Sequence, residues 1–128
     1  MGVNDLHNVD GYISYINSKA AEWKGKGAKT YFVSVTQGSA GTLSTRIPKF
    51  NEKMKSSLSS DVTYLDAYGY LNSAGWHSGD GVHYDKATYE KIYNYINSNT
   101  WEFLRMKKYE EKIIIDYNYN FNVMFNWM

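Results

Sequence analysis

A chain of 128 residues, 43% of them hydrophobic, is long enough to form one domain with a single buried core. Its 14 Lys and Arg against 13 Asp and Glu leave a net charge of +1, which favours neither nucleic acid nor an anionic membrane as a partner. The absence of cysteine excludes disulfides, thiolate catalysis and sulfur-based zinc sites. The sequence has no apolar run of about 18 residues, so no membrane-spanning segment is predicted.

The first helix is expected to begin near Asp10, which can cap it, and to end at the glycines of "KGKG" (24–27). Apolar residues recur on one face of this segment, at Ile13, Ile16, Ala20 and Trp23. The charge-free run "TYFVSVT" (30–36) that follows is rich in strand-forming residues. It predicts a strand buried on both faces.

A loop, "QGSAGTLST" (37–45), leads into a second amphipathic helix expected from Thr45 onward, with Pro48 in its first turn. The apolar positions of this helix are Ile47, Phe50, Met54 and Leu58. "DVTYLDAY" (61–68) predicts a second strand, and the glycine-rich stretch 66–84 is expected to be a loop.

Asp85 is expected to cap a third helix. The inner face of that helix is predicted to carry Tyr89, Ile92, Tyr93 and Ile96. Helices alternating with strands at this spacing predict βαβ crossovers, and hence an α/β domain with a parallel sheet over residues 1–98.

The last segment, 99–128, has a different pattern, since it begins as a possible continuation of the helix and ends in an alternation of Asn and aromatic residues. "DYNYNFNVMFNW" (116–127) has the period of a strand that would be exposed and adhesive if nothing covered it. An aromatic ligand-binding edge is one interpretation, and an atypical tail outside the domain is the favoured one.

The motif "DGVHYD" (80–85) places Asp80 and His83 before the third helix, on the rim where a parallel α/β sheet carries its ligand site. Asp80 can accept the Nδ1–H of His83, which leaves Nε2 to take a proton from a serine hydroxyl as a general base. A D-x-x-H spacing also arises by chance. The alternative is a loop aspartate that caps backbone amides beside a surface histidine.

"GVND" (2–5) precedes the first helix and is expected at the same rim. Asn4 can offer its side-chain N–H to a developing oxyanion, and Gly2 permits a sharp exit from a strand. Asn4 and Asp5 can also be turn residues without a catalytic role.

"GVND" and "DGVH" together resemble two sequence blocks of the SGNH hydrolases, the GDSL esterase/lipase family. The resemblance covers about residues 1–98, the carboxyl-terminal half of such a domain. It implies a three-layer α/β/α sandwich with a parallel, flavodoxin-like sheet, and metal-free hydrolysis of esters of small molecules, lipids or glycans. It assigns Asp80 and His83 to a catalytic triad and Asn4 to the oxyanion hole, with Gly2 and Asp5 as supporting residues.

The family's G-D-S block, which carries the nucleophilic serine, should precede "GVND", and only Met1 does so. Ser39 in "GSAG" and Ser78 in "HSGDG" are poor substitutes, because Ser39 has the wrong chain order and Ser78 has no strand-to-helix elbow. The expectation is an amino-terminally truncated hydrolase that holds no nucleophile and has little or no activity. A sheet that lacks its first strand would also expose an edge through which copies can associate.

Two other classes of function compete with the esterase. His77, Asp80 and His83 form H-x₂-D-x₂-H, whose nitrogen and oxygen ligands could hold a divalent metal ion. The chain's 13 tyrosines and 4 tryptophans could instead stack on sugar rings in a non-catalytic glycan-binding or assembly module. The competing explanation is that the helix-face tyrosines fill the core and its border, namely Tyr12, Tyr15, Tyr89 and Tyr93. The cysteine-free, Tyr- and Asn-rich composition favours an exported protein.

Overall fold

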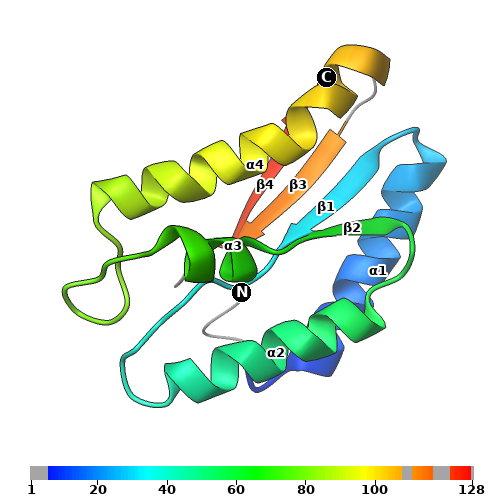
Figure 1. Cartoon of the computed structure of the whole chain (residues 1–128). Helices are drawn as coiled ribbons and strands as arrows, with labels where there is room; N and C mark the ends of the chain where they lie inside the picture. Colours follow the sequence, from blue (N-terminus) through cyan, green and yellow to red (C-terminus); the bar gives the residue numbers. More distant parts are fainter. Residues whose placement is uncertain (1–5, 108–110, 117–121, 128) are drawn as a thin grey trace.

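The computed structural model describes residues 6–107, 111–116 and 122–127, with side chains up to Thr100. The elements in chain order are α1 (Val9–Gly25), β1 (Lys29–Val33), α2 (Leu43–Ser57), β2 (Val62–Leu65), α3 (Ala67–Ala74), α4 (Lys86–Lys107), β3 (Glu111–Asp116) and β4 (Asn122–Trp127). Figure 1 shows helices on both sides of the sheet, with α1 and α2 on one side and α4 on the other.

The strands form one sheet in the order β2-β1-β3-β4. β1 runs parallel to β2 on one side and to β3 on the other, and β4 closes a hairpin antiparallel to β3. The predicted α/β class and the parallel pairing of the first two strands are therefore confirmed. β1 is not an edge strand, because it pairs with β2 on one side and with the backbone of β3 on the other. In the described part of the chain β2 and β4 form the edges, and association through either stays a prediction.

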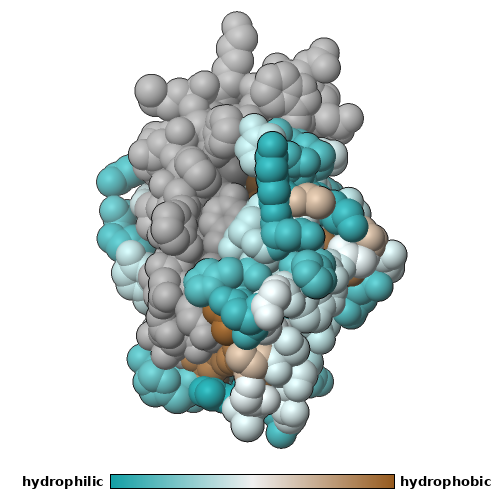
Figure 2. Space-filling view, turned by 90° about the vertical axis from the view of Figure 1, so that its left-hand side faces the viewer, coloured by the Kyte–Doolittle hydropathy of each residue, from teal (hydrophilic) through white to brown (hydrophobic). Residues whose placement is uncertain are grey.

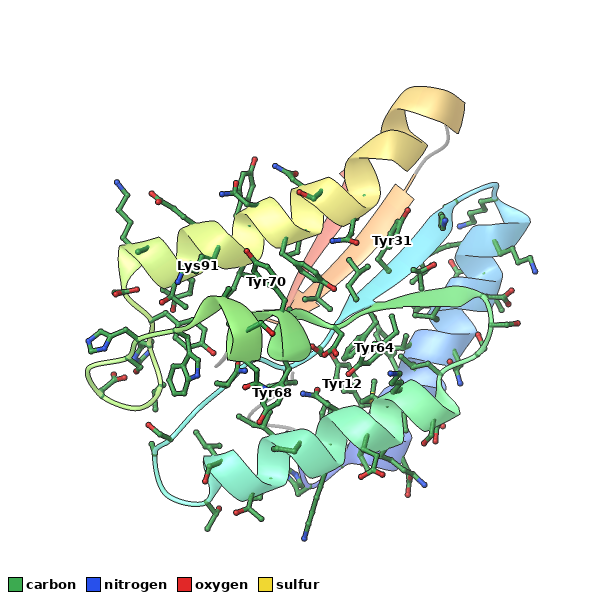
Figure 3. All side chains as sticks on the ribbon, viewed as in Figure 1. Tyr12, Tyr31, Tyr64, Tyr68, Tyr70 and Lys91 are labelled. Carbon is green, nitrogen blue, oxygen red and sulfur yellow. The ribbon has the colours of Figure 1, made fainter. Side chains whose placement is uncertain are left out.

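The side chains of β1 alternate between two hydrophobic clusters, one on each face of the sheet. Phe32 packs with the buried residues of α1 and α2, whereas Tyr31 and Val33 pack with those of α3 and α4. All three are fully buried, as expected of a strand covered on both faces. Figure 3 shows this division, with Tyr12 and Tyr64 below the sheet and Tyr31 and Tyr70 above it, toward α4.

The predicted apolar face of α1 is confirmed, because Ile13, Ile16, Ala20 and Trp23 are all buried. Asp10 does not cap the helix, however. Asn8 occupies the N-cap position and Asp10 lies in the first turn, where a negative charge favours the helix dipole. At the other end Gly27, at φ 79°, closes a Schellman motif in which Ala28 N donates to Trp23 O and Gly27 N donates to Lys24 O.

The next two elements differ from prediction at their ends. β1 stops at Val33, three residues short of the expected strand end, and α2 begins at Leu43 instead of Thr45. Pro48 consequently lies inside α2, beyond its first turn. The missing N–H of Pro48 deprives Ser44 O of an i−4 partner, and Ser44 is exposed, so water can replace that bond.

The stretch 66–84 contains a helix, so the prediction of a continuous loop is wrong. α3 starts where Asp66 caps it by accepting a hydrogen bond from Gly69 N at 2.9 Å, and it ends before Gly75 at φ 83°. A Cβ at position 69 would overlap the Asp66 carboxylate, so this cap requires glycine there. The buried pair Ala67 and Leu71, four residues apart, anchors α3 on the sheet.

Asp85 caps α4 as predicted, accepting from Thr88 N at 2.8 Å. Ile92 and Ile96 are buried on the inner face, but Tyr93 is 56% exposed, so its assignment to that face is wrong. α4 continues to Lys107 without a break at residue 98. None of the helices in the described ranges is both long enough and apolar enough to cross a bilayer.

Asn51 of α2 continues the hydrogen bonding of the sheet after β1 ends. Its Oδ1 accepts from Val35 N at 2.9 Å and its Nδ2 donates to Val35 O at 2.7 Å. Both residues are buried, so no water can substitute for either bond. The side chain thereby fixes the direction in which the chain leaves the sheet toward the loop 37–42.

We expect Asn51→Ala to lower the free energy of unfolding by about 2–4 kcal/mol, because it leaves both backbone groups of Val35 buried without partners. Asn17 offers a matched control, since its half-buried amide makes the same pair of bonds to Ser57 O and Ser59 N. Asn17→Ala should cost only about 1 kcal/mol because water can reach those groups. Urea unfolding of both variants measures the difference. Equal losses in the free energy of unfolding would contradict the argument that burial makes the Asn51 bonds more costly to lose.

Candidate functional site

The loop 75–85 lies against the loop that follows β1, on the carboxyl side of the parallel strands. Gly81 O accepts hydrogen bonds from Ser39 N at 2.9 Å and Ala40 N at 3.1 Å. Tyr84 OH donates to Gln37 O. These contacts between segments some forty residues apart hold the motif "DGVHYD" at the rim (Figure 1).

Asp80 and His83 are in direct contact on this rim, where His83 Nδ1 lies 2.6 Å from Asp80 Oδ2. Their side chains are 54% and 65% exposed, respectively. Figure 2 views the carboxyl side of the sheet, and the described surface there is mainly hydrophilic, with only small hydrophobic areas. We call Asp80 and His83 the dyad. Their catalytic role stays a prediction.

The two oxygens of Asp80 have different partners. Oδ1 accepts from Val82 N at 2.8 Å and His83 N at 2.7 Å, closing a tight turn, while Oδ2 faces the imidazole. Gly81 makes this turn possible, because its φ of 79° lies in the left-handed region. The capping and the histidine-orienting interpretations of Asp80 therefore apply together, one to each oxygen.

The hydrogen bond from the His83 ring is the largest cause that holds the pKa of Asp80 well below its ordinary value, followed by the hydrogen bond from His83 N. Asp80 is consequently ionised at neutral pH and can only accept hydrogen bonds. Nδ1 of His83 must then be the donor, and in the neutral ring Nε2 is the acceptor. This is the tautomer that a general base needs.

Ser78 belongs to the hydrogen-bonding of the same turn. Its Oγ donates to His83 O at 2.6 Å, lies 3.2 Å from Asp80 Oδ1 and accepts from Val82 N at 2.9 Å. Ser39 is exposed in the loop after β1, and its backbone N–H is used by Gly81 O. Neither serine lies at a strand-to-helix elbow, because both β1 and α3 end several residues before them.

The other predicted site residues at the amino-terminal end, Gly2, Asn4 and Asp5, lie outside the described residues. α1 runs antiparallel to β1, so its amino-terminal end points toward the carboxyl side of the strands (Figure 1). The shared pocket of Asn4 and His83 stays a prediction.

The metal interpretation is not supported, because no three His, Asp or Glu side chains in the described ranges come together as a group that could hold a metal ion. His77 is tied instead to the start of α4. Its backbone N donates to Thr88 Oγ1 at 3.0 Å and its carbonyl accepts from Asp85 N. The dyad and His77 therefore serve different parts of the loop.

The residue that follows His83 in the chain belongs to a cluster of aromatic side chains. Tyr84, adjacent to His83 and buried, makes edge contacts with Trp76 and Tyr89 at ring-centroid distances of 5.8 and 5.4 Å. Tyr12 is in the core as well, whereas Tyr15 is 41% exposed. The explanation that the helix tyrosines fill the core and its border thus holds for Tyr12 and for Tyr89, which packs partly buried against the core, but not for Tyr15 or Tyr93.

The contacts from Ser39, Ala40 and Gln37 were not foreseen in the sequence. Their signal is weak, because two of them are made by backbone N–H groups and the third by a carbonyl. The role of Ser78 in the turn had a weak signal, since serine and aspartate side chains in loops commonly form hydrogen bonds with nearby backbone groups.

Comparison of the chain with known proteins gives no match to any protein-family model, curated protein or solved structure.

Proposed function

We propose that Asp80 and His83 are the acid–base part of an ester hydrolase site of the SGNH type. The observation that carries the proposal is the 2.6 Å contact between Asp80 Oδ2 and His83 Nδ1, which directs the basic Nε2 of the ring outward from its carboxylate partner. The exposure of the imidazole supports access to a substrate.

In this role His83 Nε2 takes the proton of a hydroxyl as its oxygen attacks the carbonyl carbon of the ester. The Asp80 carboxylate stabilises the imidazolium that forms, and the imidazolium then gives the proton to the departing alkoxide. In an SGNH hydrolase the hydroxyl is that of a serine. No serine of this chain is assigned that part, so water is the hydroxyl source that we expect the dyad to activate here.

The fold is compatible with this family, whose domains are three-layer α/β/α sandwiches. Helices α1 and α2 pack on one face of β1, and α3 and α4 pack on the other, as that architecture requires. Asn4 is proposed as an oxyanion-hole donor, with Gly2 and Asp5 in support. The proposed substrates are esters of small molecules, lipids or glycans.

The test is hydrolysis of p-nitrophenyl acetate by the chain and by two histidine variants. We expect slow hydrolysis above the buffer rate, since a site without its nucleophile keeps only residual catalysis. His83→Ala should remove most of that excess and bring the rate close to that of the buffer, because it removes the general base. His77→Ala, a matched exposed histidine of the same loop, should leave it unchanged.

Equal rates for the His83→Ala variant and the unsubstituted chain would contradict the proposal. Treatment with a fluorophosphonate addresses the nucleophile separately. We expect no labelled serine, and mass-spectrometric mapping of a label to Ser39 or another serine would overturn the expectation that the chain holds no nucleophile.

A further inference from the structure

The side-chain hydroxyl of Ser78 forms hydrogen bonds with two backbone groups of the turn that carries His83. It accepts from Val82 N at 2.9 Å and donates to His83 O at 2.6 Å. Asp80 Oδ1 accepts a hydrogen bond from His83 N. The backbone N–H and C=O of His83 are therefore both tied, one to each of these residues.

This arrangement reduces the freedom of the imidazole. With the backbone of His83 held at N and O, only the two side-chain torsions remain, and the bond from Nδ1 to Asp80 Oδ2 restrains these. The single hydrogen of Ser78 Oγ favours His83 O, at 2.6 Å, over Asp80 Oδ1, at 3.2 Å. Asp80 Oδ1 is thus left to the two backbone N–H groups, and Oδ2 to the ring.

We propose that Ser78 is a positioning residue of the dyad, which sets the orientation of the His83 ring through the backbone of residues 82 and 83. The inference rests on the proposed function for its catalytic consequence, but its structural content is independent of turnover. Ser78 acts through His83, because its hydroxyl donates a hydrogen bond to the backbone carbonyl oxygen of His83.

The experiment compares Ser78→Ala with Ser78→Thr, which restores the hydroxyl. The first readout is the low-field NMR signal of the proton between His83 Nδ1 and Asp80. We expect Ser78→Ala to broaden or abolish this signal and Ser78→Thr to restore it. Ser56→Ala is the matched control, since it removes a serine hydroxyl bonded to a single backbone carbonyl of α2, that of Lys53.

The second readout is the His83-dependent hydrolysis of p-nitrophenyl acetate, which should fall about tenfold in Ser78→Ala and recover in Ser78→Thr, as expected for a misplaced catalytic group. An unchanged NMR signal in Ser78→Ala, with the far-UV circular dichroism of the unsubstituted chain, would overturn the role of Ser78. If the signal responds as expected while the unsubstituted chain shows no His83-dependent hydrolysis, the positioning role stands and the proposed function fails.

Discussion

Asp80→Asn is expected to abolish the His83-dependent hydrolysis of esters while leaving the fold intact. The reason is the division of labour between the two carboxylate oxygens. Oδ1 accepts two backbone N–H groups, so the oxygen of the new amide must stay there. The amide NH₂ then takes the place of Oδ2, 2.6 Å from His83 Nδ1, and donates to it. The ring is forced into the tautomer that carries its proton on Nε2, which cannot accept one.

The expected loss is the whole of the hydrolysis that depends on His83, down to the uncatalysed rate, because general-base catalysis is removed altogether. Ring ¹⁵N chemical shifts give a direct measurement, since they distinguish a protonated from an unprotonated Nδ1. Asp85→Asn is the matched control, because Asp85 also caps a backbone N–H, that of Thr88, and the substitution removes the same charge. Persistence of the Nδ1–H tautomer in Asp80→Asn would contradict the argument.

Asp80→Asn also shows how much of the loss of folding stability at low pH comes from Asp80 and how much from the rest of the chain. The hydrogen bonds to Asp80 lower its pKa in the folded state. Its contribution to stability is therefore present above the pKa of the unfolded carboxyl, about 4, and is lost as the pH falls through the lower folded value. Asp80→Asn should lack this part of the acid transition when unfolding is followed at a series of pH values below about 5.

Periodicity predicted the buried faces of the helices well where apolar residues repeat along a helix. Ile13 and Ile16 of α1 and Ile92 and Ile96 of α4 are buried as expected, because a stripe three or four residues apart must face the sheet. Tyr93 was placed wrongly because it is adjacent to Ile92. The buried stripe of α4 instead follows a spacing of four, through Thr88 and Thr100.

The prediction of secondary structure failed where a helix depends on a glycine and on a polar side chain that caps it. α3 was missed because Gly69 inside it suggests a loop, and only the three-dimensional contact with Asp66 shows that glycine serves the cap. The pairing of β3 with β1 was missed for a different reason. It joins residues about eighty positions apart, and pairing at that distance has no local signal.

For the candidate site, chain spacing predicted the partner of His83 but not what holds the pair in place. Asp80 and His83 are only three positions apart in the chain, so their contact is a local property of the turn. The bonds from Ser39 and Ala40 to Gly81 O depend on how the loop after β1 folds back, which no local pattern specifies. Gly81 is the residue at which these local and distant constraints meet.

Gly81→Ala is expected to destabilise the protein by about 2–4 kcal/mol, for two reasons that add. Its φ of 79° strains any residue with a Cβ, and the new methyl group would lie 2.7 Å from Ala40 N and 2.9 Å from Ser39 Oγ. Ala40 N belongs to the backbone, so a side-chain rotation cannot relieve the clash. One of the two loops must move, which would break the hydrogen bonds to Gly81 O and displace the dyad.

Two other glycines separate these causes. Gly27 has the same φ of 79° with nothing within 4 Å of its Cβ position, so Gly27→Ala should cost only the conformational strain, about 1–2 kcal/mol. Gly79 lies in the same loop as Gly81 with neither constraint, and Gly79→Ala should be nearly neutral. Urea unfolding of the three variants measures both the cost of the backbone strain and the cost of the clash with the loop after β1. A loss in Gly81→Ala no larger than that in Gly27→Ala would show that the loop after β1 yields freely, in which case it cannot be what holds the dyad in position.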